Sequence, residues 1–132
     1  MADLVKVTDL GLEHVAAAVL ALGATEPKYV EWGIGGATAP LRTQTDLTTP
    51  SAEARGYDSS AVVDSGEAGA ETDTYRTIAT ITSLSDAHAV TEVGTFTNLT
   101  VGLMFLRATF SAINLETGNS IEFTIDTKFA PA

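Results

Sequence analysis

Few residues of this chain combine a reactive type with surroundings that could support catalysis. Glu92 is the strongest candidate, because it stands among the apolar residues Val90, Val93 and Phe96. A carboxyl group in such surroundings can have a raised pKa and act as a general acid, for example in a small glycan-active enzyme. No second carboxylate or histidine is near it in the sequence. The simpler interpretation is an ion pair across a sheet with Arg107, on the next apolar segment.

The other candidates for nucleophilic or metal chemistry lack a recognisable motif. His14 and His88 are the only histidines, and neither has the spacing of a known metal-binding pair. Ser65 lies in VDSGEAG, which lacks the first glycine of a nucleophile elbow. There are no cysteines, so the chain has no disulfide, thiolate metal site or cysteine nucleophile. We therefore predict no catalytic residue, no metal site and no cofactor.

Glycines and acidic residues mark two further segments. Gly33, Gly35 and Gly36 follow an apolar segment, but Thr38 stands where a dinucleotide fingerprint has its third glycine, so a turn is expected. A second group could hold calcium, although its spacing matches no EF-hand loop and a solvated acidic loop is the simpler interpretation. Its members are Asp58, Asp64, Glu67, Glu71 and Asp73.

Composition narrows the possible partners. The chain has 132 residues and a net charge of −10, which repels phosphate backbones and anionic membranes. The first ten residues lack the basic and long apolar segments of a signal peptide. The longest helix-like apolar run, residues 15–22, is too short to span a bilayer. We therefore expect one domain, residues 1–132, that binds neither nucleic acid nor membrane.

The chain divides into a helix, an irregular arm and a set of strands. Residues 8–22 predict a helix capped by Thr8 or Asp9, with an apolar stripe of Leu12, Val15, Val19 and Leu22. The stripe fits either this protein's own sheet or a partner. Residues 28–34 predict a strand, whose Tyr29 and Trp32 suit a sugar-stacking surface, core packing or an interface.

Residues 36–73 show little periodicity, so we predict a long irregular arm, ordered against a neighbouring subunit, with one short strand near residues 61–63.

The second half of the chain is rich in β-strand signals. Residues 74–84, 88–96, 103–113 and 120–129 predict four antiparallel strands in a meander. In the last of them Ile121, Phe123 and Ile125 alternate with polar residues, as in a strand with one buried face. Such strands need a second layer, so the fold class is mainly β: an antiparallel β-sandwich or jelly-roll-like domain with one N-terminal helix.

Residues 101–106, VGLMFL, put apolar groups on both faces of a strand. This is expected of a central strand covered by the helix, or of a contact with a subunit or partner.

The C-terminal half resembles a family of small virion proteins of tailed bacteriophages. The likeness rests on AVTEVGTF and LMFLRATFSAINLETGNSIEFTIDTKFA, with YVEWGIGGATAP earlier in the chain. It covers roughly residues 29–49 and 74–130, and departs from the family at Thr95 and at the turn of residues 97–101. The resemblance implies a structural protein of the virion, described as capsid decoration (cement) or tail-fibre-like, and carries no catalytic motif.

The expected function is therefore decoration of a phage head. The protein would bind the major capsid protein on the outer surface, bridge capsid subunits and form a homo-oligomer, a trimer or a dimer. It would be made in the host cytoplasm. The alternative is a tail or tail-fibre component that contacts the host surface. Partner contacts are expected at Leu4, Val5, Val7, Leu10, Tyr29 and Trp32.

Overall fold

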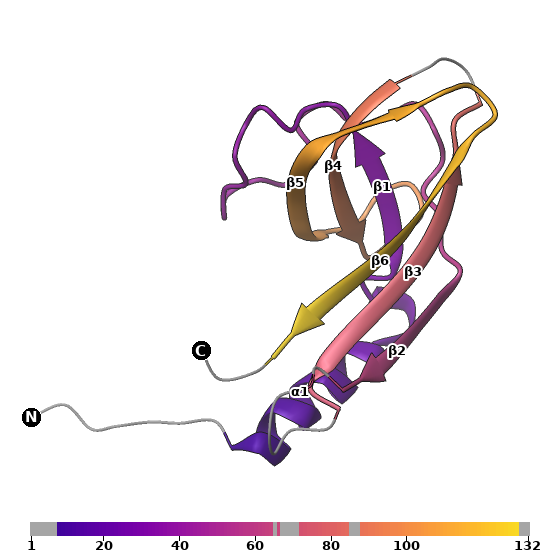
Figure 1. Ribbon diagram of the computed structural model, residues 1–132. Helices are drawn as coiled ribbons and strands as arrows, with labels where there is room; N and C mark the ends of the chain where they lie inside the picture. The colour runs from indigo at the N-terminus through magenta and orange to yellow at the C-terminus, as the bar shows by residue number, and fades with distance from the viewer. Residues whose placement is uncertain (1–7, 65, 67–71, 85–87, 130–132) are drawn as a thin grey trace, which may run out of the picture.

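The protein is a small β-sandwich with a helix at one end (Figure 1). The computed structural model describes residues 8–64, 66, 72–84 and 88–129. Within them one α-helix precedes a short 3₁₀ helix and six strands. In chain order these are α1 (Asp9–Leu20), η1 (Gly23–Thr25), β1 (Tyr29–Gly33), β2 (Ser59–Val63), β3 (Thr74–Thr82), β4 (His88–Phe96), β5 (Met104–Leu115) and β6 (Ser120–Lys128).

The strands form two antiparallel sheets of three strands each. Sheet A has the order β1-β4-β5, and sheet B has the order β2-β3-β6. The predicted mainly-β sandwich is confirmed, but the simple meander is wrong, because β3 and β4 belong to different sheets and β6 pairs with β3. Splitting the strands between two sheets buries an apolar face of each against the other, which one meander cannot do. Six described strands make a smaller sandwich than an eight-stranded jelly roll.

The core lies between the two sheets. Sheet A contributes Val30, Trp32, Val90 and Val93, and sheet B contributes Ala79, Ile81 and Phe123. The final strand follows its predicted alternation, because Phe123 is buried and Ile121 and Ile125 are half-buried while Glu122, Thr124 and Asp126 are exposed. β6 therefore closes sheet B with one face in the core.

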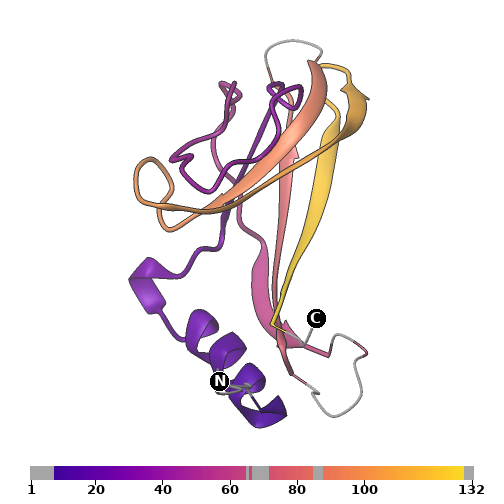
Figure 2. The ribbon, with the colours of Figure 1, turned by 90° about the vertical axis from the view of Figure 1, so that its left-hand side faces the viewer.

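The helix begins where the sequence predicts, but it does not cover residues 101–106, which is one of the two interpretations of that apolar segment. The Thr8 hydroxyl oxygen accepts a hydrogen bond from the Gly11 amide at 3.1 Å, the usual N-cap arrangement. α1 packs against β2 and β3, beside the part of sheet B that sheet A leaves uncovered (Figure 2). The idea that it covers residues 101–106 is wrong, since β5 is an edge strand of the other sheet. Only Ala16 of α1 is fully buried, and Val15 in the apolar stripe is 41 % exposed.

The first part of the predicted arm is a loop that wraps the outer face of sheet A. Gly33 bridges to Pro50 and Val30 bridges to Gly56, so the loop runs back along β1. Leu47 is buried in it, and β2 confirms the short strand expected near residues 61–63. This part of the arm is ordered against the protein's own sheet, so the expectation that it needs a neighbouring subunit is wrong.

We expect Phe123→Ala to lower the free energy of unfolding by about 3–5 kcal/mol, because it removes a buried aromatic ring from between the sheets. The control is Thr124→Ala, the adjacent and exposed position of the same strand, which should cost at most about 1 kcal/mol. Urea denaturation followed by tryptophan fluorescence measures both values. Equal effects at the two positions would contradict the assignment of the buried face.

Candidate functional site

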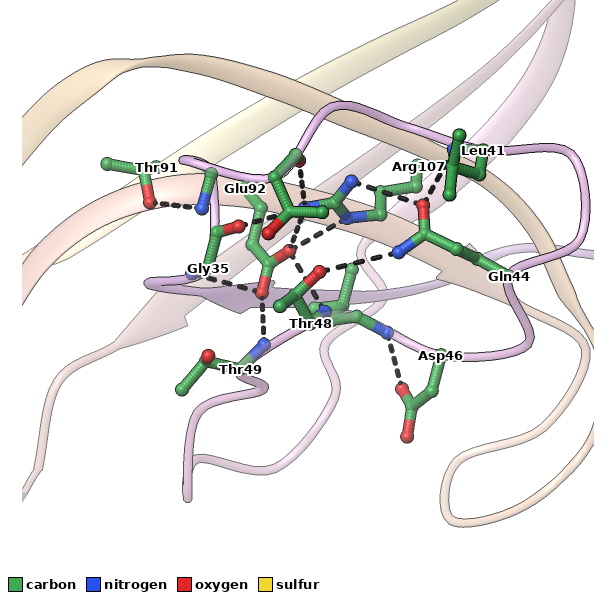
Figure 3. A network of polar contacts seen from close by, with 12 residues as sticks. Gly35, Leu41, Gln44, Asp46, Thr48, Thr49, Thr91, Glu92 and Arg107 are labelled. Carbon is green, nitrogen blue, oxygen red and sulfur yellow. Dashed lines mark hydrogen bonds and ion pairs between the residues drawn. The ribbon is translucent and has the colours of Figure 1, made fainter.

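The most elaborate polar site is a buried carboxylate on the outer face of sheet A (Figure 3). Glu92, on β4, has no exposed surface. Its Oε1 accepts hydrogen bonds from the backbone amides of Thr49 at 2.8 Å and Gly35 at 3.2 Å, and its Oε2 accepts one from the Thr48 amide at 3.2 Å. The loop of residues 34–49 is thus attached to β4 through Glu92, and also through Thr91, whose hydroxyl accepts a hydrogen bond from the Gly36 amide at 2.9 Å.

Arg107, on β5, completes this site. Its guanidinium lies 2.8 Å (Nε) and 2.7 Å (Nη2) from Oε2 of Glu92, and the side chain is only 2 % exposed. The remaining donors reach the carbonyl oxygens of Gly35 and Thr38 at 3.0 and 2.9 Å, and Oε1 of Gln44 at 3.2 Å. The predicted ion pair of Glu92 with Arg107 is confirmed, and it also holds the loop.

Two glycines make room for this arrangement. A Cβ atom on Gly35 would lie 2.8 Å from Oε1 of Glu92, and one on Gly33 would lie 2.5 Å from the same oxygen. Contacts this short force a shift in a carboxylate that is already held by several donors. The glycine-rich segment is therefore a turn, as expected, and its glycines let the backbone approach Glu92 closely.

Glu92 is ionised. Burial by itself raises the pKa of its carboxyl group and is the largest single effect. The hydrogen bonds from the Thr49 amide, Arg107 and the Thr48 amide together outweigh burial and lower the pKa of Glu92 from 4.5. A general acid requires a raised pKa, so the expectation that Glu92 could have one is wrong. A carboxylate without a proton or exposed surface is placed to hold the loop, not to protonate a substrate.

A second polar cluster joins the segment before β1 to sheet B. The buried Glu26 accepts hydrogen bonds from the Tyr75 hydroxyl at 3.0 Å and from the Ser60 hydroxyl, and Lys28 lies 3.9 Å away. Burial and the neighbouring Glu26 raise the pKa of Tyr75 well above its ordinary value, so its hydroxyl keeps its proton. This cluster also has a structural role, since it fixes the chain between η1 and β1 against β2 and β3.

The partner-binding residues expected from the sequence meet different outcomes. Trp32 is fully buried in the core beside His88, with 5.0 Å between ring centroids, so its expected contact with a partner is wrong. Tyr29 is half-buried against Tyr57. Leu10 is 77 % exposed at the start of α1 and is available to a partner. Leu4, Val5 and Val7 lie outside the described residues.

The acidic residues of the arm that the structure describes do not converge on a metal site. Asp58 accepts a hydrogen bond from the Thr80 hydroxyl at 2.7 Å, and Asp64 accepts one from the Gly66 amide at 2.7 Å. Asp73 is buried and accepts one from the Thr74 hydroxyl. Glu67, Glu71 and the serine at position 65 lie outside the described residues. In the part of the chain that is described, no three acidic or histidine side chains could hold a metal ion together.

A candidate site for binding another macromolecule is an apolar hollow between the β4–β5 loop and η1, which lie on the same side of the molecule in Figure 2. Its volume is about 350 Å³. Most of its lining is apolar: Leu22, Thr25, Pro27, Thr97, Leu103, Met104 and Phe105. Leu103 at its rim is 76 % exposed and Leu22 is 50 % exposed. Exposed apolar side chains beside such a hollow can receive an apolar group of a partner.

The loop that forms one wall of the hollow is held firmly. Arg55 donates hydrogen bonds to the carbonyl oxygens of Asn98 at 2.8 Å and Val101 at 2.9 Å, while its Nε lies 3.2 Å from Glu31. Its guanidinium also stacks over the Phe96 ring, 3.7 Å from the centroid. The Leu103 amide donates to the Thr97 hydroxyl at 2.9 Å. The exposed apolar side chains are therefore preorganised, which reduces the entropy lost on binding.

Sequence reasoning found one wall of this hollow and missed the other. The unusual apolar content of residues 101–106 was the available signal, and it indicated either burial or an interface. The spacing places Leu22 in the helix stripe, and no pattern in the sequence marks Pro27. Nothing local in the sequence indicates that the end of the helix segment and the β4–β5 loop meet.

No protein-family model matches this chain, and no curated protein matches it either. None of the helices in the described part of the chain is long and apolar enough to cross a membrane. The candidate sites are therefore judged on their geometry.

We expect Arg107→Met to lower the free energy of unfolding by about 3–5 kcal/mol, because it leaves the buried charge of Glu92 unpaired. The matched control is Arg76→Met. Arg76 forms an ion pair with Asp126 at 2.7 Å, but both side chains are well exposed, so its loss should change stability little. Hydrogen exchange should also show faster exchange of the Thr48 and Thr49 amides in Arg107→Met. A stable variant with these amides still protected would contradict the role of the pair.

Glu92 and Glu31, the two glutamates on the outer face of sheet A, should have pKa values on opposite sides of 4.5, the ordinary value for a glutamate. The pKa of Glu92 is lowered, and the pKa of Glu31 is raised because burial outweighs its contact with Arg55. Stability contributed by the Glu92 charge is present above about pH 4.5 and is lost as the pH falls through the lowered pKa. The raised pKa of Glu31 has the opposite effect on stability. As the pH falls, the folded state binds a proton at Glu31 before the unfolded state does, so this protonation favours the folded state. Carbon-13 NMR of the side-chain carboxyls measures both, and the reverse order would contradict the buried network.

Proposed function

We propose that the protein is a capsid decoration (cement) protein of a tailed bacteriophage. It binds the outer surface of the head and stabilises the shell by bridging subunits of the major capsid protein. The observation that carries this proposal is the preorganised apolar hollow beside the β4–β5 loop. The sequence resemblance also supports it, and part of that resemblance lies in the β4–β5 region.

The hollow defines the kind of contact. An apolar or aromatic side chain of the shell would enter between Leu22 and Phe105, and Leu103 at the rim would be covered. Charge selects where on the shell this happens, since a chain with a net charge of −10 approaches basic or neutral surfaces more readily than acidic ones. Burial of apolar surface then supplies the affinity.

The polar network of Glu92 fits the same function. A decoration protein works as a rigid part between subunits, and the buried pair fixes a loop to the outer face of sheet A. The buried carboxylates Glu92 and Glu26 are both engaged in hydrogen bonds that hold the fold.

The number of copies in purified particles tests this proposal first. In particles of a phage that encodes this chain, quantitative mass spectrometry should find a copy number similar to that of the major capsid protein. A handful of copies per particle would favour the tail or tail-fibre alternative. Absence from the particles would overturn the virion function altogether.

We expect Leu103→Glu to weaken binding to heads that lack the protein by about tenfold or more, because it places a charge at the rim of the apolar hollow. Leu84→Glu is the matched control: this leucine, in the β3–β4 connection, is 74 % exposed but does not line the hollow. Co-sedimentation with the heads measures both affinities. Equal loss of binding in the two variants would contradict the assignment of this surface.

A further inference from the structure

β5 has an outer edge that is open among the described residues. It is the third strand of the order β1-β4-β5 and, with 12 residues, the longest described strand. It pairs with β4 on one side, and within the described part of the chain no strand pairs with it on the other. Its outward N–H and C=O groups are therefore a template for another strand. The register with β4 is regular from Leu106 to Thr109 and shifts on both sides of this stretch.

This edge lacks two of the usual protections against pairing, proline and exposed charge, although the ladder with β4 is irregular on either side of residues 106–109. Natural edge strands carry charged residues or proline that discourage another strand from adding to the sheet. β5 contains no proline, and its one charged residue, Arg107, is turned to Glu92 and only 2 % exposed. The exposed side chains of the strand are neutral: Phe105, Ala108, Ser111, Ala112, Ile113 and Asn114.

The outer strands of sheet B are different. β6 carries exposed Glu122, Asp126 and Lys128, and β2 is flanked by exposed Asp58 and Asp64. Two copies of a chain with a net charge of −10 repel each other, and they do so most where carboxylates face each other. Along β5 itself no exposed carboxylate is present, and the nearest in sequence, the exposed Glu116, follows the end of the strand at Leu115. The hollow beside the first half of the strand adds a basic residue, Arg42, and no acidic one.

We propose that β5 pairs antiparallel with β5 of a second copy, about a twofold axis centred near Ala108. An antiparallel pair of identical strands is self-complementary, which is the requirement for a closed twofold interface. The regular stretch around Ala108 provides the ladder, and the small side chain lets the two strands approach at the axis. The result is a continuous six-stranded sheet of the order β1-β4-β5-β5-β4-β1.

Edge pairing also explains why an arginine is buried at this position. With Arg107 turned onto Glu92, the strand retains the β4 ladder and presents no charge to the partner. The inference is independent of the proposed function, since the purified chain alone can form the dimer. Ala108 does not line the hollow assigned to shell binding, so the two surfaces can be tested separately.

The test is the oligomeric state of the purified full-length chain by sedimentation velocity over a range of concentrations. We expect a species of twice the chain mass of 13.7 kDa. Ala108→Glu should raise the dimer dissociation constant by about tenfold or more, because it places two carboxylates against each other at the axis. The matched control is Ala61→Glu, the same change at an exposed alanine of the β2 edge, which should leave the dimer intact.

A second measurement does not depend on any variant. Hydrogen exchange of the wild-type chain should show protection of the β5 amides that increases with protein concentration, while protection of β6 amides stays constant. A wild-type chain that remains monomeric at high concentration would overturn the inference. So would a dimer that Ala108→Glu and Ala61→Glu weaken equally, or one that forms without protecting β5.

Discussion

The outer face of sheet A depends on one buried ion pair. Glu92 and Arg107 lie on neighbouring strands, so their contact links β4 to β5, and their remaining hydrogen bonds attach the loop of residues 34–49 to both. Charges are costly to bury, and this pair is tolerated because each oxygen of Glu92 accepts at least two contacts from donors. The loop has little apolar content with which to pack, so polar contacts to a single carboxylate position much of it.

This arrangement gives sheet A two distinct packed faces. The inner face packs on sheet B through aliphatic and aromatic side chains such as Trp32 and Val93. The outer face is covered by the protein's own loop, with Leu47 beside Gly94 and Arg55 over Phe96. β4, the central strand, is therefore buried on both sides, and six of its nine residues are buried. A sheet held from both faces is a stiff support for the loop at its end, which is where the exposed apolar residues gather.

Charged side chains and exposed apolar side chains lie on different parts of the described surface. The net charge of −10 gives a general repulsion between copies of the chain. The hollow at the β4–β5 loop and the edge of β5 are the described places where neutral, partly apolar surface is presented on a rigid backbone. Both proposals follow from this separation, because each assigns association to a place where exposed charge is scarce.

The local features of this protein were determined by its sequence. The alternation of residues 120–129 predicted the buried face of β6, Thr8 predicted the start of the helix, and Glu92 with Arg107 predicted an ion pair, because periodicity, capping and opposite charge on adjacent strands act over short range. The tertiary structure decided which strands share a sheet, that Trp32 is core, that the loop packs on sheet A and that β5 is an edge. These outcomes depend on which distant segments bury apolar surface together, and strands with the same alternation can pair in several ways with similar local free energy.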